Sequence, residues 1–418
     1  MPTLYLPQLR RDQWAIAQHP AKIKVLAMGR RWGKTILGGS ISLSVASAGG
    51  KVAWVVPTYK NGRPLWRWAM QFVGPLKKRR HVRTNNSERI IEFSNGGFLG
   101  LYSADNEDSI RGEWFHVAIV DEAAMVSETA WQEAIQPTLA DVNGDAILIG
   151  TPKGRNWFFT EYQRGLADGK QQVAFHAPTS GNPSPQIQRA FKLVKDRLPE
   201  RVYRQEWLAE FLEGQGVVFR NIRPNLVAPL NSQPADHVGH RLVMGVDWGK
   251  SNDYTVLSVF CADCGREVAL DRFNKIDYSF QRGRLTALVE RWQVGHIEAE
   301  ANSIGEPNIE ELRRAGLPVV AFQTTATSKP PLIESLSLAF EKEEAAWLPD
   351  EVAAQELEAY EVKLNSVTGR PTYGAPEGLH DDTVMARALA WRAATHAPGW
   401  ATWASQQLKK VDDARNNE

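Results

Sequence analysis

The stretch Met28-Gly29-Arg30-Arg31-Trp32-Gly33-Lys34-Thr35 decides the fold of the first half of the chain, because it ends in Gly-Lys-Thr, as a phosphate-binding loop does. It follows an apolar run, Ile23 to Ala27, and precedes apolar residues at helical spacing, so the pattern is strand, loop and helix. The standard loop has four residues between its glycines, whereas this stretch has three. An ordinary glycine-containing helix N-terminus therefore remains an alternative.

A nucleotide-binding loop would use these residues in defined ways. Backbone N–H groups at the helix start would surround the phosphates, Lys34 would reach the β and γ phosphates, and Thr35 would bind Mg²⁺. The Arg30 guanidinium lies inside the loop, where it could reach phosphate oxygens. The other candidate nucleotide-binding positions of the loop are Gly29, Arg31 and Gly33.

A second apolar run, Val117 to Val120, ends in two acids, Asp121 and Glu122. Asp121 at the end of a strand suits Mg²⁺ binding through water, and Glu122 suits polarisation of the attacking water. A strand followed by an acidic helix N-cap has a similar pattern. The loop and the acidic strand occur in this order, about 86 residues apart. Together they predict an ATPase core.

Two further features belong to this core. The run Ala146 to Ile149 leads into Gly150-Thr151-Pro152-Lys153-Gly154, where the Thr151 hydroxyl could sense the γ-phosphate, although an ordinary turn would look the same. Arg111, in Ser109-Ile110-Arg111-Gly112, precedes the acidic strand. Either Arg30 or Arg111 could neutralise transition-state charge, and a surface ion pair is the alternative for Arg111.

The second half carries acids at the ends of predicted elements. Asp247 ends the apolar run that begins at Leu242, Glu298 and Glu300 lie at the end of the run from His296, and Asp381 with Asp382 precedes an alanine-rich helix. Such acids can converge on a pair of metal ions that cleaves a phosphodiester, and oxygen-only ligands favour Mg²⁺ or Mn²⁺.

Each acid has a simpler interpretation when taken alone. Asp381 or Asp382 could be a helix cap, whereas Asp247 would be costly to bury among apolar neighbours without a partner. Glu298 and Glu300 are two residues apart and share one face of a strand, so alternation does not choose between them.

Length and composition set wider limits. A chain of 418 residues predicts two domains, and a net charge of +1 means that any nucleic-acid surface must be local. The sequence shows no run long enough to span a membrane and no signal peptide, so we expect an intracellular protein. Its two cysteines, Cys261 and Cys264, could form half a zinc site, but without a second pair a plain hairpin turn is favoured.

The patterns divide the chain into five parts. We expect an α/β ATPase core with a parallel sheet over residues 1–155, a small helical lid and linker subdomain over 156–219, and an interdomain linker over 220–240. A second β-rich unit follows over 241–397, and residues 398–418 form a polar tail.

These two constellations, in this order on one chain, resemble the large terminase subunit of tailed bacteriophages, a DNA-packaging motor and nuclease. The resemblance runs from about Gln13 to Arg392 and rests on the basic phosphate loop, the Ser109–Glu113 stretch, the acidic strand, the Gly150-Thr151-Pro152 segment and the three acid clusters. A pattern around Gln205-Glu206 is similar to the family's stretch between its domains.

The resemblance implies a P-loop ATPase of the ASCE type joined to a nuclease of the RNase H and resolvase type. It implies that Gln13 contacts adenine, that Arg30 acts in its own subunit, and that Arg111 acts on a neighbour in a ring. It also implies that Glu300 is preferred to Glu298 as a metal ligand beside Asp247 and one or both of Asp381 and Asp382.

The implied ligands and partners follow from the same resemblance. They are ATP, Mg²⁺ with Mn²⁺ as an option in the nuclease site, double-stranded DNA, a portal protein, a small terminase subunit and further copies of the chain in a ring. The implied location is the host cell cytoplasm. The chain is short for the family, and this departure concerns the portal-docking surface more than the chemistry.

Two rival functions remain open. One is a host helicase-nuclease or restriction-type DNA motor, although no full run of helicase motifs follows Thr151. The other is a DNA-binding structural subunit with an inactive ATPase, which the presence of Lys34, Thr35, Asp121 and Glu122 disfavours.

Overall fold

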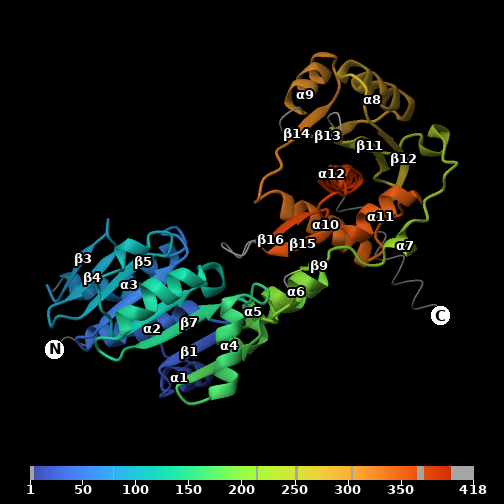
Figure 1. Ribbon diagram of the computed structural model, residues 1–418. Coiled ribbons are helices and arrows are strands. Elements are labelled where there is room, and N and C mark those ends of the chain that lie inside the picture. The colour runs from blue at the N-terminus through green and yellow to red at the C-terminus, as the bar shows by residue number, and fades with distance from the viewer. Residues whose placement is uncertain are drawn as a thin grey trace. The chain divides into compact units, whose positions relative to one another are not determined.

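The computed structural model describes residues 4–78, 80–212, 215–249, 253–302, 305–364 and 371–396. The expected tail at 398–418 lies outside these residues. The described residues form two compact units: one holds residues 4–212 together with Leu364, and the other holds residues 215–363 and 371–396. Figure 1 shows the elements of each unit. In the described part of the chain, no helix is both long and apolar enough to cross a membrane.

The first unit is built around one eight-stranded sheet with the order β3-β4-β5-β2-β6-β7-β1-β8. Its strands are β1 (Ile23–Met28), β2 (Lys51–Val56), β3 (Val82–Asn85), β4 (Ile90–Phe93), β5 (Phe98–Ser103), β6 (Val117–Asp121), β7 (Asp145–Gly150) and β8 (Gln172–Ala177). Its α-helices are α1 (Arg11–Ala17), α2 (Lys34–Ser47), α3 (Arg63–Lys78), α4 (Trp157–Asp168), α5 (Pro185–Lys195) and α6 (Glu200–Glu206).

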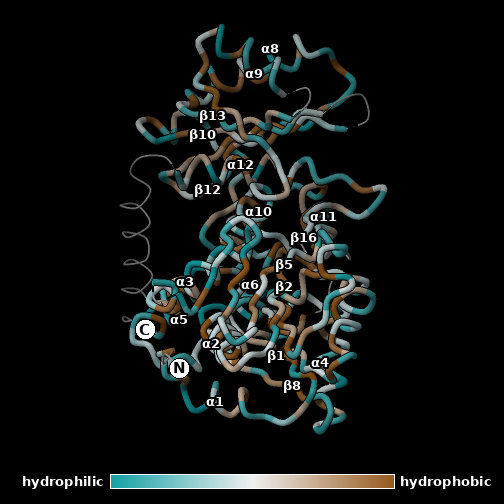
Figure 2. Tube along the Cα trace, turned by 90° about the vertical axis from the view of Figure 1, so that its left-hand side faces the viewer, coloured by the Kyte–Doolittle hydropathy of each residue, from teal (hydrophilic) through white to brown (hydrophobic). Residues whose placement is uncertain are grey.

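The predicted parallel sheet is confirmed. The strands from β5 to β8 in this order run parallel, and β7 separates the loop strand β1 from the acidic strand β6. Successive residues of a strand face opposite sides: Leu26 packs in one hydrophobic cluster and Val25 in another. Figure 2 shows the hydrophobic colour along β1 and β2, as expected for strands covered on both faces.

Two parts of this sheet were not foreseen. An antiparallel extension, β3-β4-β5, forms one edge. The other edge is β8, which pairs with β1 from Ile23 to Met28 although it lies within the 156–219 segment assigned to a helical subdomain. The helices also cover only part of this segment, because α6 stops at Glu206 and Ala209 adopts a φ of 59°. The finer division of this segment stays a prediction.

The second unit contains a five-stranded sheet, β12-β11-β10-β13-β14, and a small sheet, β16-β15-β9. Its strands are β9 (Gln215–Val217), β10 (Leu242–Asp247), β11 (Thr255–Cys261), β12 (Arg266–Phe273), β13 (His296–Glu300), β14 (Val319–Phe322), β15 (Glu361–Leu364) and β16 (Pro371–Gly374). Its helices are α7 (Ile222–Asn225), the 3₁₀ helix η6 (Pro234–His237), α8 (Tyr278–Trp292), α9 (Gly305–Arg314), α10 (Lys329–Glu341), α11 (Glu351–Ala359) and α12 (Asp382–His396).

The central strand β10 is antiparallel to β11 and parallel to β13. Helix α12 lies directly against it, because Gly245 offers no side chain: a Cβ there would lie 2.0 Å from the Ala386 carbonyl oxygen and 2.3 Å from the Ala390 nitrogen. This close approach explains why α12 is rich in alanine, and it brings the start of the helix to the end of β10.

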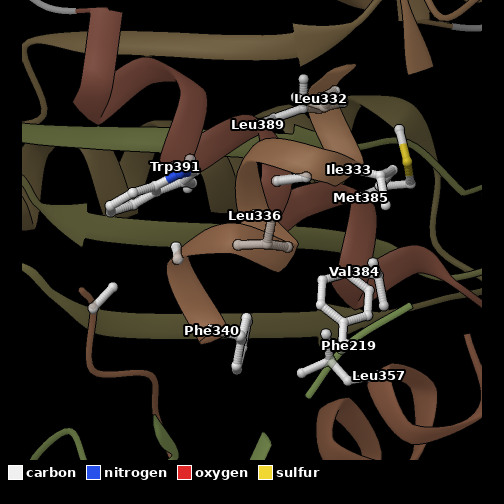
Figure 3. Close-up of a cluster of buried hydrophobic side chains, with 14 of the residues drawn as sticks. Phe219, Leu332, Ile333, Leu336, Phe340, Leu357, Val384, Met385, Leu389 and Trp391 are labelled. Carbon is white, nitrogen blue, oxygen red and sulfur yellow. The ribbon is translucent and has the colours of Figure 1, made fainter. Parts of the chain in front are cut away.

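The other face of α12 packs in a separate core. Figure 3 shows Leu332, Ile333, Leu336 and Phe340 of α10 beside side chains from α12 and α11. These side chains are buried, and burial of each stabilises the fold by about 1.5–3 kcal/mol. Helix α12 is therefore held between a sheet and a second hydrophobic layer.

Candidate active sites

The phosphate loop connects β1 to α2, and the backbone requires its two glycines. Gly33 adopts a φ of 113°, which disfavours any side chain. A Cβ on Gly29 would lie 2.6 Å from both the Thr179 nitrogen and the Trp207 carbonyl oxygen. The loop with three intervening residues therefore forms a strand-to-helix connection, with α2 beginning at Lys34 and Thr35 as its second residue.

Lys34 lies at the centre of this site. Its ammonium donates hydrogen bonds to the Met28 carbonyl at 3.0 Å, the Gly29 carbonyl at 3.3 Å and the Thr151 hydroxyl at 3.0 Å. Burial lowers the pKa of Lys34, and the charges of Glu122 and Asp121 oppose that shift. Thr151, which is expected to sense the γ-phosphate, is thus in direct contact with Lys34, which is expected to bind it.

The acidic pair ends β6, two strands away from β1. The Asp121 carboxylate accepts a hydrogen bond from the Glu122 backbone N–H at 3.0 Å, and Glu122 has a left-handed φ of 51°. Burial raises the pKa of Asp121 to about 7, and the Glu122 charge adds to the shift while Lys34 opposes it. The structure therefore brings Lys34, Thr151, Asp121 and Glu122 to one end of the sheet.

Arg30 has a partner that its position in the sequence did not reveal. Its guanidinium forms an ion pair with Glu206, which also binds the Lys153 ammonium, and its backbone N–H donates to the Glu206 carbonyl at 2.8 Å. Burial would raise the pKa of Glu206, but the charges of Lys153 and Arg30 lower it overall. The sequence places Glu206 in the family-like stretch and Lys153 in a predicted turn, and neither position indicates a contact with Arg30.

Gln13 contacts the loop from α1, and Arg31, a residue of the loop, has a partner outside it. Gln13 is buried; its side-chain nitrogen donates to the Gly33 carbonyl at 3.2 Å and its oxygen accepts from the Arg10 backbone. The Arg31 carbonyl accepts a hydrogen bond from Asn182 at 2.7 Å. Gln13 thus lies beside the loop, and its contact with adenine stays a prediction.

Arg111 makes local contacts in its own turn. Its guanidinium lies 3.1 Å from the Glu107 carboxylate and 3.9 Å from that of Asp108, and its side chain is half exposed. This is the surface ion pair that the sequence offered as the alternative to a catalytic role for Arg111. A role toward a neighbouring subunit stays a prediction.

The second site lies at the carboxyl ends of β10 and β13. These parallel strands pair Val246 with Ala299, so the next residue on each strand is an acid, Asp247 or Glu300. Asp247 is only 7% exposed. Burial raises its pKa well above the ordinary value, and the Glu300 carboxylate raises it further, followed by Asp382 and Asp381 at the start of α12.

Glu298 has a different environment from Glu300. Its carboxylate forms an ion pair with Arg392 and lies 3.7 Å from His296. Glu300 instead interacts with Asp247, and the Asn302 amide donates to it at 3.3 Å. This geometry supports Glu300 as the ligand candidate. The two residues that follow Asn302 lie outside the described ranges.

The acids of α12 differ in their partners. Asp381 forms an ion pair with Lys329 at 3.1 Å, whereas Asp382 accepts a hydrogen bond from the Tyr254 backbone at 3.1 Å and lies 3.7 Å from His380. Burial raises the pKa of Asp382 to about 6, and the Tyr254 hydrogen bond opposes that shift. All four candidate carboxylates thus meet at one place.

Comparison with known families gives one match in each half of the chain. Residues 25–223 match the family described as "Terminase large subunit, T4likevirus-type, N-terminal", and residues 244–393 match the "Terminase RNaseH-like domain". The chain belongs to the large terminase subunit family. It is an ATPase and nuclease enzyme of phage type, with the ATPase domain first and the RNase H-like domain second.

Individual terminases are similar over most of the chain. The large subunit of Thermus virus P23-45 is 29% identical over 420 residues, covering 91% of this chain and 86% of its own. That of Escherichia phage T5 is 28% identical over 242 residues, covering 56% and 54%. A solved large terminase from a thermophilic bacteriophage has the same fold, with a TM-score of 0.60 at 15% identity, covering 93% and 99%. The predicted fold class is therefore confirmed.

Proposed function

We propose that this terminase hydrolyses ATP to move double-stranded viral DNA into procapsids and cuts that DNA with a metal-dependent endonuclease. The proposal rests on one observation. In each unit, the charged groups that a phosphoryl-transfer reaction needs lie together at the carboxyl ends of the central strands. The first gathers Lys34, Thr151 and an acidic pair, and the second gathers four carboxylates.

In the first unit, ATP is the substrate that fits the loop. The large terminase of a thermophilic bacteriophage has been solved in complex with ATP-γ-S and with ADP. Lys34 exchanges its backbone carbonyl partners for the β and γ phosphates, and Glu122 orients and deprotonates the attacking water. Because Lys34 also holds the Thr151 hydroxyl, its movement to the phosphates changes the contacts of Thr151. This exchange supports a sensing role for Thr151.

Divalent cations fit both acidic sites. Thr35 and Asp121 would hold Mg²⁺ in the ATPase, and Asp247, Glu300, Asp381 and Asp382 would hold Mg²⁺ or Mn²⁺ in the nuclease, where the donors are all oxygen. When bound, the ions supply an activated water and stabilise the leaving oxygen of the phosphodiester. Burial raises the pKa of Asp247 and repulsion from the neighbouring carboxylates raises it further, so a cation at this place would be favoured by the same negative charges.

The remaining residues position these groups. Asn302 orients Glu300, the Tyr254 backbone orients Asp382, and Lys329 holds Asp381. The partners proposed for the terminase are double-stranded DNA, a portal protein, a small terminase subunit and further copies of the chain in a ring, in the host cell cytoplasm. Arg111, which is exposed on the surface, is the residue proposed to act on a neighbouring subunit.

The test separates the two chemistries in the full-length protein. Glu122→Gln should lower DNA-stimulated ATPase activity by about 10²–10⁴-fold, because it removes the general base, and should retain metal-dependent DNA cleavage. Asp247→Asn should lose cleavage by at least about 100-fold and retain the ATPase. Loss of both activities in either folded variant would contradict this division of labour. Unwinding of a forked duplex would favour a helicase-nuclease instead, and no phosphate release with DNA and Mg²⁺ would favour an inactive ATPase.

A further inference from the structure

Four metal-ligating side chains meet in the second unit, outside the carboxylate site. They are His237, His240, Cys261 and Cys264, and their ligand atoms all lie within 4.8 Å of one another. Both cysteines are free thiols. The predicted hairpin turn between β11 and β12 is confirmed, and a histidine pair just before β10 supplies the two ligands that a second cysteine pair would otherwise provide.

The distances fit a tetrahedral metal ion. The Cys264 sulfur lies 3.2 Å from Nδ1 of His240 and 3.5 Å from Nδ1 of His237, and the Cys261 sulfur lies 3.6 Å from Nδ1 of His240. Zinc bonds of about 2.3 Å to sulfur and about 2.0–2.1 Å to nitrogen, at tetrahedral angles, separate a sulfur from a nitrogen by about 3.5 Å. The side chains already stand close to that separation.

The backbone holds the two pairs together independently of any ion. The first residue of β10, Leu242, pairs with Cys261 at the end of β11, and the Ala262 N–H donates to the Arg241 carbonyl at 2.9 Å. The Arg241 guanidinium binds the Asp263 carboxylate within the hairpin turn at 2.7 Å. The histidine pair and the cysteine pair are therefore placed on facing segments.

His237 supplies a second indication. It is 2% exposed, and its Nε2 atom is buried without a hydrogen-bond partner while its Nδ1 atom faces Cys264. Burying an imidazole nitrogen without a hydrogen-bond partner is costly, and this cost, which stays at Nε2, can be offset at the other nitrogen by a strong interaction. Bonding of Nδ1 to a metal ion provides one.

We propose that His237, His240, Cys261 and Cys264 form a structural zinc site. Two thiolates and two imidazoles are the ligands that zinc prefers, whereas the all-oxygen nuclease site favours harder cations. Four protein ligands leave no open position for substrate, so the ion has a structural role. It joins the segment before β10 to the β11–β12 hairpin.

The position of this site defines what it stabilises. Leu242 and Asp247 are at opposite ends of β10, about 17 Å apart at about 3.3 Å per residue. The zinc ion fixes the point where the chain enters the nuclease sheet and does not join the carboxylates. Its loss should destabilise the second unit and leave the ATPase of the first intact.

The first experiment measures metal content in the full-length protein purified from zinc-supplemented cells. Mass spectrometry of the metals should give about one zinc per chain. Cys264→Ser should retain less than a tenth of that, whereas His396→Ala, which removes an exposed histidine elsewhere in the unit, should retain it fully. Equal zinc in the wild type and Cys264→Ser, or no zinc in the wild type, would overturn the proposal.

Two further measurements apply if Cys264→Ser does not fold. Cobalt(II) added to the zinc-depleted wild type should give the visible bands and thiolate charge-transfer absorption of tetrahedral sulfur coordination. His240→Cys should keep one zinc, because it exchanges one suitable ligand for another. It should also strengthen the charge-transfer band of bound cobalt, because it adds a thiolate. Cobalt spectra without a thiolate band would contradict the proposal, whatever the nuclease and ATPase assays show.

Discussion

Glu206 holds two cations beside the phosphate loop, Arg30 and Lys153, and its own side chain is almost fully buried. The Arg30 side chain is 63% exposed, so it can leave this carboxylate when an anion binds. We therefore expect Glu206 to compete with the nucleotide phosphates for Arg30.

We expect Glu206→Gln to bind nucleotide more tightly, by about three- to tenfold, because it removes the competing negative charge. Fluorescent-nucleotide titration at low ionic strength would measure the change. Glu210→Gln is the matched control, since Glu210 pairs with Arg204. Unchanged or weaker binding in a folded Glu206→Gln protein would show that Glu206 supports the loop and does not compete with the ligand.

The acids of the nuclease site predict a pH-dependent stability. The pKa of Asp382 is about 6 in the folded protein against 3.8 for an ordinary aspartate, so the folded state binds more protons between these values. The free energy of unfolding therefore falls as pH rises from about 4 to about 6. Above the folded pKa, the folded protein carries the full cost of keeping the Asp382 carboxylate ionised, and this cost is the penalty in stability.

Asp382→Asn should remove that penalty, because an amide oxygen can still accept the Tyr254 hydrogen bond. Without added Mg²⁺ or Mn²⁺, we expect its Tm to exceed that of the wild type by on the order of 3 °C at pH 8 and by nothing near pH 4. Asp108→Asn, at a fully exposed acid, should show no difference. A gain that persisted at pH 4 would mean that the effect is not one of ionisation.

At the scale of elements, the contact between α12 and β10 sets the nuclease geometry. Gly245→Ala would place a methyl group 2.0 Å from the Ala386 carbonyl oxygen, so the helix must shift and move Asp381 and Asp382 away from Asp247. We expect a loss of about 1–3 kcal/mol in the free energy of unfolding, together with loss of cleavage. Denaturant unfolding and a plasmid-cutting assay would measure the two effects.

The control for this change is Gly283→Ala. A Cβ at Gly283, within α8, meets no atom within 4 Å, so alanine should be neutral or stabilise the helix by up to about 1 kcal/mol. If both variants cut DNA like the wild type, close helix–strand packing is not what positions the acids.

The strands that end in acids could be predicted, because an apolar run and the carboxylate at its end are neighbours in the sequence. Asp121 and Asp247 were placed at strand ends, and both occur there. Contacts between distant segments could not be predicted from the sequence. Examples are the ion pair of Arg30 with Glu206 and the approach of the histidine pair to the cysteine pair. Strand alternation did not choose between Glu298 and Glu300, whereas the family resemblance favoured Glu300. The structure adds a physical reason for that preference, because Arg392 from another element pairs with Glu298.

At the scale of the whole molecule, charge is nearly balanced: 49 lysines and arginines against 48 acids. Binding to DNA must therefore come from local groups of cations that contact phosphates, which carry no sequence information. A packaging motor that advances along any sequence needs this kind of contact, since base-specific hydrogen bonds would hold it at preferred positions.

We therefore expect the affinity of Asp247→Asn, which should bind DNA without cutting it, to fall by about 10³-fold or more between 50 and 200 mM salt if about six phosphates are contacted. Fluorescence anisotropy with two duplexes of equal length and unrelated sequence should give the same slope of log Kd against log salt. Affinity that barely changes with salt, or that differs strongly between the duplexes, would indicate direct base recognition. That outcome would favour a site-specific nuclease over a motor that moves along the DNA backbone.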